Sequence, residues 1–168
     1  MRSTVRIATA VALLAGLAGA AHAQTQTASI TAQAVVQSPL NVTAGNNLDF
    51  GNVLPGVPKS VAAADASAGS FRIQGQSTFE VAMTYTLPAT LDDGLTNTLA
   101  IGTWTGLHNG TNSTAGATSF APSGVANVDV YGTGDIWVFL GATVTPGANQ
   151  VAGTYTGTIQ LDVAYTGN

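Results

Sequence analysis

Strict alternation between apolar and polar side chains is the feature of this 168-residue chain that most restricts its fold. One alternating run spans residues 79–87 and a second spans residues 154–165. Successive side chains of a β-strand point to opposite faces, so each run predicts a strand with one buried face. The second run is the predicted C-terminal strand, and its expected buried face consists of Tyr155, Gly157, Ile159, Leu161, Val163 and Tyr165. The chain is therefore predicted to be all-β.

A third alternating run lies near the N-terminus, over residues 27–37, with Val35 as its one exception. The residues on its apolar face are Ala28, Ile30, Ala32, Ala34 and Val36. Two interpretations stay open for this run. It is either an edge strand that begins its own domain, or a strand that is exchanged with another copy and completes a sheet there.

Shorter runs of strand-forming residues, each bounded by turn residues, favour a sandwich of two sheets. They lie at residues 48–50, 71–73, 99–101, 125–131 and 136–140. Their number and spacing predict an immunoglobulin-like antiparallel β-sandwich of about seven to nine strands. The run 136–140 is apolar on both faces, so we expect both of its faces to be covered, with the alternative that Trp137 and Phe139 face a partner.

Residues 102–124 are rich in Gly, Thr, Asn and Ser and have weak periodicity. Such a composition predicts a long loop, with room for one short hairpin. The sequence Tyr131-Gly132-Thr133-Gly134 predicts a hairpin turn that leads into the strand of Trp137.

The first 23 residues have the form of a secretory signal peptide. Arg2 and Arg6 precede an apolar run, and Ala21-His22-Ala23 provides the small residues of a cleavage site. The apolar run, residues 7–20, is too short to span a bilayer. We therefore predict a signal peptide at 1–23, a single β-sandwich domain at 24–168 and no transmembrane segment after cleavage. The expected location is the periplasm, the cell surface or the extracellular space.

The charged residues restrict the partners of residues 24–168. Lys59 and Arg72 are the only basic residues there, against eight acidic residues. A nucleic-acid partner is not expected, because such binding requires basic side chains that displace counterions from the phosphates. The sequence contains no cysteine, so it can form neither a disulfide nor a thiolate metal site.

No catalytic residue, metal ligand or cofactor is predicted. His108, the only histidine of residues 24–168, is expected in a polar surface loop outside any catalytic triad. Asp92-Asp93-Gly94 predicts an Asp-Gly turn in preference to a calcium loop. Trp104 could stack on a sugar ring, although a position capping the core is favoured. A hydrolase with two carboxylates, such as Glu80 and Asp129, stays open because the sequence does not give their separation.

The order of several short motifs resembles a bacterial domain-of-unknown-function family, number 4402. The motifs are LDFGNVLPG at 48–56, FRIQG at 71–75, LGATV at 140–144 and the run 153–165. The resemblance covers nearly all of residues 24–168, and the family is similar in outline to spore-coat-U-type and chaperone–usher pilin subunits. It implies an exported immunoglobulin-like sandwich that can assemble by strand exchange, without the disulfide that many pilins carry.

We therefore expect an exported, non-catalytic structural or adhesive surface protein, similar to a pilin of a fimbrium or a coat subunit. Its expected partners are further copies of itself or other surface subunits, joined by β-strand addition. The alternative is a monomeric secreted module that binds carbohydrate or protein.

Overall fold

The structure is a computed structural model that describes residues 25–167. The predicted signal peptide, 1–23, lies outside the described residues. The chain divides into two units, one up to Val35 and one from Val36 onward, and the described part of the first unit forms no strand. Residues 25–167 include no helix that could span a membrane.

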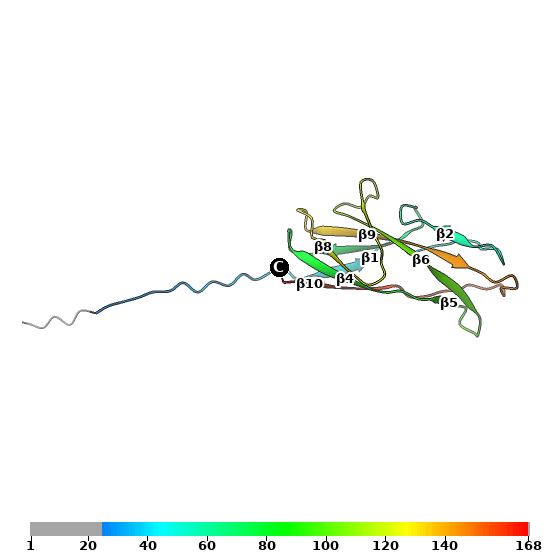
Figure 1. The fold of residues 1–168 in the computed structure, drawn as a ribbon, viewed down its shortest axis with the longest axis horizontal. Helices are drawn as coiled ribbons and strands as arrows, with labels where there is room; N and C mark the ends of the chain where they lie inside the picture. The colour runs from blue at the N-terminus through cyan, green and yellow to red at the C-terminus, as the bar shows by residue number, and fades with distance from the viewer. Residues whose placement is uncertain (1–24, 168) are drawn as a thin grey trace, which may run out of the picture. The chain divides into compact units, whose positions relative to one another are not determined.

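The described part of the second unit has ten strands, arranged as two antiparallel sheets (Figure 1). Their bounds are β1 (Asn41–Ala44), β2 (Lys59–Val61), β3 (Gly69–Gln74), β4 (Glu80–Thr86), β5 (Thr90–Asp92), β6 (Thr98–Asn109), β7 (Thr118–Phe120), β8 (Val125–Asp129), β9 (Asp135–Thr145) and β10 (Gln160–Tyr165). The larger sheet has the order β1-β3-β9-β6-β5, with β2 also paired to β9 and β7 to β6. The smaller sheet has the order β10-β4-β8. The predicted antiparallel β-sandwich is confirmed.

The apolar face of β9 forms the centre of the larger sheet. Ile136, Val138 and Leu140 alternate along β9, and each has 0% of its surface exposed. On the opposite face of β9, Phe139 is buried and Trp137 lies beneath the Arg72 guanidinium, 5.4 Å from the ring centroid. The prediction that residues 136–140 are covered on both faces is thus confirmed, with Trp137 only half-buried.

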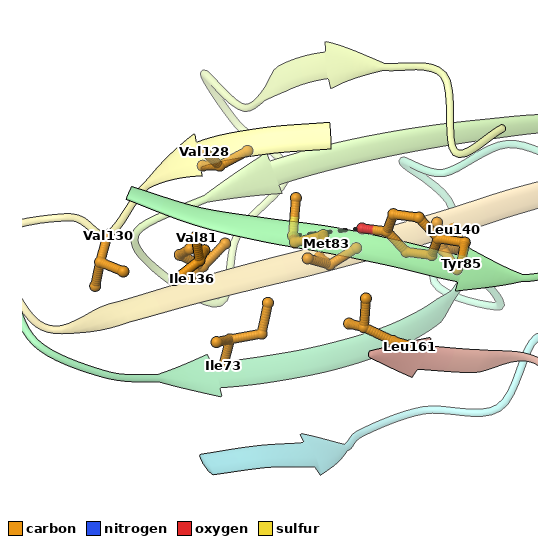
Figure 2. Close-up of a cluster of buried hydrophobic side chains, with 10 residues drawn as sticks. Ile73, Val81, Met83, Tyr85, Val128, Val130, Ile136, Leu140 and Leu161 are labelled. Carbon is orange, nitrogen blue, oxygen red and sulfur yellow. Dashed lines mark hydrogen bonds between the residues drawn. The ribbon is translucent and has the colours of Figure 1, made fainter. Parts of the chain in front are cut away.

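Inward side chains of the two sheets meet in the main core, as Figure 2 shows for residues of β3, β4, β8, β9 and β10. The main core consists of Ile73, Val81, Met83, Tyr85, Val128, Val130, Ile136, Val138, Leu140 and Leu161. The Tyr85 hydroxyl donates a hydrogen bond to the Met83 sulfur, 3.4 Å away. Burial raises the pKa of Tyr85, because the apolar core disfavours the phenolate. The predicted strand at 79–87 is therefore a central strand, β4.

A second core cluster lies on the larger sheet and is covered mostly by segments outside the smaller sheet. Its buried residues are Phe50, Val61, Ala68, Leu99, Ile101, Ala142 and Val144. The half-buried side chains that cover it include Leu48, Val53, Leu91 and Tyr155. Trp104 also packs there, which confirms that it caps the core.

Gly141 illustrates why a strand can require glycine. A Cβ atom at this position would lie 2.4 Å from the Val61 carbonyl oxygen and 2.5 Å from the Ala63 nitrogen. Both contacts are with backbone, which cannot rotate away as a side chain can. Gly141 therefore permits the close approach of the backbone at Val61–Ala63.

Several predicted elements are wrong in detail. Residues 48–50 form no strand: the Asp49 amide donates to the Ser67 carbonyl, and the Asp49 carboxylate caps a turn at Gly51. Much of the predicted loop 102–124 is strand, because β6 continues to Asn109 beyond a bulge at Gly102–Thr105. The short hairpin expected within it is confirmed, since β6 pairs with β7 over residues 106–108 and 118–120. The turn at 131–134 joins β8 to β9, which belong to different sheets, so it is not a hairpin.

Replacement of Leu140 by alanine tests the main core. Leu140 is fully buried, so Leu140→Ala should lower the free energy of unfolding by about 2–5 kcal/mol, measured by urea denaturation. Leu95 is 80% exposed and provides the matched control. Leu95→Ala should change the free energy by less than about 0.5 kcal/mol. Equal losses in the two variants would contradict the assigned core.

Candidate functional site: the edge beside β10

The predicted C-terminal strand is shorter than expected but has the expected facing. β10 begins at Gln160, and Thr156 forms an isolated antiparallel bridge with Asp92. The predicted inward face contains the buried Leu161 and the half-buried Tyr155, Ile159, Val163 and Tyr165, whereas Gly157 is exposed. The alternate residues, Thr154, Thr156, Thr158, Gln160, Asp162 and Ala164, are all exposed. The alternation therefore predicted which side chains face the core, but not where the ladder begins.

The inward side chains near β10 are covered less completely than those of its neighbour. On β4, Val81 and Met83 have 0% exposure, while Val163 and Tyr165 on β10 are only half-buried. Among the described strands β10 pairs with β4 alone, so its other edge has no strand beside it. An edge of this kind presents backbone donors and acceptors to any strand that can approach it.

A cavity of about 1000 Å³ opens beside residues 150–159, which precede β10, and none of its lining residues belongs to β10 itself. Residues 46–53, which follow β1 at an edge of the larger sheet, line it from one side. Residues 150–159, which lead into β10 at an edge of the smaller sheet, line it as well. Its apolar lining includes Phe50, Leu99, Ile101, Leu140 and Val144. We call this space the edge cavity.

Hydrogen bonds position the segment that lines the edge cavity before β10. The Tyr155 hydroxyl donates to the Val151 carbonyl at 2.7 Å and accepts from the Gln150 amide group at 2.8 Å. The same amide nitrogen donates to the Thr98 carbonyl at 3.1 Å. These bonds hold residues 150–155 against β6, so this part of the lining is anchored at both of its ends.

Tyr165 closes the opposite end of the β10 edge. Its hydroxyl accepts from the Gln76 amide at 2.6 Å and donates to the Ser38 carbonyl at 2.9 Å. Its ring packs edge-on against Phe79, with the centroids 6.1 Å apart. Gly75 leaves room for this hydroxyl, which would lie 2.8 Å from a Cβ at that position. Tyr165 thereby connects Ser38, near the start of the second unit, to the end of β10.

The residues predicted as an exchange or edge strand form no strand in the structure. Residues 25–39 have no strand partner and are exposed, with Ile30 at 96% and Val36 at 93%. The interpretation that residues 27–37 begin their own domain as a strand is therefore wrong. The outer edge of β3 is already taken by β1, which follows the segment in the chain.

His108 does not lie in a surface loop, contrary to the prediction. It is on β6, half-buried, and its Nδ1 lies 3.1 Å from the Tyr131 hydroxyl. The imidazole also packs against Phe120, with the ring centroids 5.9 Å apart. This burial lowers the pKa of His108, because the imidazolium would lose solvation.

The acidic residues that the sequence offered as metal ligands or catalytic groups do not line the edge cavity. Asp92 and Asp93 accept hydrogen bonds from the amides of Gly94 and Leu95, which confirms the predicted turn. Hydrogen bonds from Asn97 and from backbone amides hold the pKa of Asp93 below its ordinary value. The strand register places Glu80 of β4 opposite Asp129 of β8.

The fold and the edge cavity define a class: a two-sheet antiparallel β-sandwich with an accessible edge beside its last strand. The sequence matches the family described as "Domain of unknown function (DUF4402)" over residues 40–165. The chain belongs to this family. No curated protein matches the chain. The family match begins at Leu40, so it excludes the exposed segment 25–39 and includes both linings of the edge cavity.

Sequence reasoning missed part of this site. Gln150 gave no signal, because a single glutamine in a polar stretch cannot be assigned a hydrogen-bond partner from sequence. Leu48 and Phe50 were visible as apolar residues, but they were assigned to a strand at 48–50 and not to a cavity lining.

Replacement of Tyr165 by phenylalanine tests the closed end of the edge. The variant removes both hydroxyl hydrogen bonds, so the free energy of unfolding should fall by about 1 kcal/mol. Hydrogen exchange should also accelerate at the Gln76 amide, which loses its acceptor. The neighbouring Gly75 amide donates to the Gly134 carbonyl and provides the internal control. Unchanged exchange at Gln76 would contradict the assigned contact.

The lowered pKa of His108 predicts a pH dependence of stability. The unfolded chain takes up a proton near the ordinary pKa of 6.5, while the folded imidazole resists protonation. The free energy of unfolding should therefore fall as the pH drops below about 6.5. His108→Gln keeps a polar group near Tyr131 but cannot titrate, so its melting temperature should vary less between about pH 7 and pH 5.5. Parallel curves for the two proteins would refute the assignment.

Proposed function

We propose that this chain is an exported, non-enzymatic structural or adhesive surface protein whose copies assemble by β-strand addition. In this proposal, residues 27–37 of one copy lie along the β10 edge of the next copy and cover its edge cavity. The observation that carries the proposal is the coexistence of an exposed alternating segment and an accessible strand edge in the same chain. The sequence features of a signal peptide support export.

The chemistry of the segment matches the chemistry of the edge. The segment has backbone donors and acceptors without strand partners, and so does the outer side of β10 within the described fold. Pairing them forms a ladder in which each hydrogen bond contributes about 0.5–1.5 kcal/mol. The ladder supplies affinity, while alternate side chains that enter the cavity supply specificity.

The apolar side chains of the segment give a second source of stability. Ile30 and Val36 are among the most exposed large apolar side chains of the described residues. Full burial of each would stabilise the assembly by about 1.5–3 kcal/mol. The opposite face carries Thr27, Ser29, Thr31, Gln33 and Gln37, which suit a surface that stays in water.

The two faces of the segment provide a matched test. Chains that begin at Gln24 should show a mass that rises with concentration in light scattering. Ile30→Asp with Val36→Asp places two charges on the apolar face and should leave a monomer, because buried charges without partners are strongly unfavourable. Thr31→Asp with Gln37→Asp places the same charges, at the same spacing, on the polar face and should preserve assembly.

Removal of residues 24–37 separates assembly from folding. The shortened chain keeps Ser38 and its contact with Tyr165, so it should remain a folded monomer with little change in melting temperature. Unmodified chains that stay monomeric at every concentration would overturn the proposal. Equal assembly of the two double aspartate variants would overturn the role of residues 27–37.

A further inference from the structure

The strand register brings three loops to one end of the larger sheet. They are residues 51–58 before β2, residues 93–97 between β5 and β6, and residues 146–153 after β9. Lys59 of β2 pairs with Val144 of β9. Ala100 of β6 pairs with Thr145 of β9, so the starts of β2 and β6 meet the end of β9. Figure 1 shows β2 and β5 at this end and the end of β10 at the other. We call the three segments the tip loops.

Hydrogen bonds and tight turns hold the tip loops in place. The Gly56 amide donates to the Gly147 carbonyl at 2.9 Å, which joins two of the loops. The Gln150 side-chain amide donates to the Thr98 carbonyl, directly after the third loop, at 3.1 Å. Gly56 and Gly94 have φ angles of 72° and 76°, in the left-handed region that favours glycine. The tip loops therefore present their side chains from fixed turns.

The tip loops carry most of the exposed large aliphatic side chains of the fold. The four that they carry are Leu54, Val57, Leu95 and Val151, each more than half exposed. Residues 40–167 expose only two other side chains of this kind, Val42 on β1 and Val125 on β8. An apolar surface that is concentrated in this way marks a contact with a partner.

The tip loops carry almost no charge. Residues 51–58 and 146–153 contain no charged residue, and residues 93–97 contain only Asp93. The Asp93 carboxylate accepts hydrogen bonds from the backbone amides of Leu95 and Asn97 and from the Asn97 side chain, all within its own loop. Transfer of these loops into an apolar phase therefore takes little charge out of water.

We propose that the tip loops insert their aliphatic side chains into the surface layer of a lipid membrane with neutral, zwitterionic headgroups. The four side chains come from separate turns, and none is covered by the others. A membrane surface accepts separate apolar projections of this kind, whereas a protein partner needs a surface of complementary shape. Anionic lipids are recognised by clusters of basic side chains, and Lys59 is the only basic residue beside these loops.

The lipid contact is separate from the assembly contact. Leu54, Val57 and Leu95 do not line the edge cavity, whereas Val151 does. Residues 27–37 of one copy can therefore cover the edge cavity of another while the tip of that copy still meets lipid. The inference adds a lipid-binding end to the surface protein and does not depend on strand addition.

Flotation with phosphatidylcholine vesicles tests the tip. The chain from Gln24 is used with Ile30→Asp and Val36→Asp, so that the exposed N-terminal segment contributes no apolar contact, and it should float with the vesicles. Leu54→Asp should lower its partition coefficient about ten-fold or more. Val125→Asp is the matched control, because Val125 is 66% exposed and Leu54 is 68% exposed, and it should leave partition unchanged.

A labelled cysteine locates the contact. The sequence has no cysteine, so Leu95→Cys and Val125→Cys can each carry a single NBD dye. Vesicles should shift the emission of the dye to shorter wavelength at position 95 and leave it unchanged at position 125.

Several results would overturn the inference. They are the absence of flotation, equal losses in Leu54→Asp and Val125→Asp, equal dye shifts at the two positions, and binding that occurs only when phosphatidylserine is added. Light scattering without vesicles gives one more: association that rises with concentration and that Leu54→Asp abolishes would assign the tip to a second copy of the chain. None of these results bears on assembly through residues 27–37, because those residues are disabled in the protein that is used.

Discussion

The packing of the apolar face of β9 against the smaller sheet is the contact on which the other parts of the fold depend. β9 pairs with β2, β3 and β6, so the larger sheet is built around it. Its inward residues, Ile136, Val138 and Leu140, share one core with residues of β4 and β10. The smaller sheet covers only part of this surface. The remainder is covered by segments outside that sheet, and the edge cavity forms where their cover is incomplete.

The sequence predicted the elements whose side chains alternate without interruption. β4 was found because burial repeats at every second residue, and the strand at 136–140 was found as a short run that is apolar on both faces. β6 was only partly found, because a bulge at Gly102–Thr105 shifts the pairing and a Gly- and Thr-rich composition hides the rest. β2 and β5, of three residues each, were too short to show a period. The local pattern of apolar and polar residues therefore predicted the class of fold, whereas pairing between distant strands determined where each strand begins and ends.

The sequence predicted the exposed segment 27–37 of the candidate site better than it predicted the edge that would accept this segment. The exposed segment was recognised from its alternation, although its backbone partners depend on surfaces far away in the sequence. The acceptor side could not be inferred, because it combines residues near Phe50 with residues near Tyr155 that no local pattern connects. His108 shows the same limit: Phe120 and Tyr131, which surround it, come from β7 and from the segment after β8.

The antiparallel pairing of β1 with β3 has a mechanical consequence. Only three residues, Ser38 to Leu40, separate the segment 27–37 from β1, so tension on that segment reaches β1 almost directly and acts along its axis. The ladder hydrogen bonds between Asn41–Ala44 and their partners run perpendicular to the strands. They therefore resist the pull together, in shear, instead of opening one after another like a zipper. A short strand placed in this way can withstand force that the same strand, peeled from one end, could not.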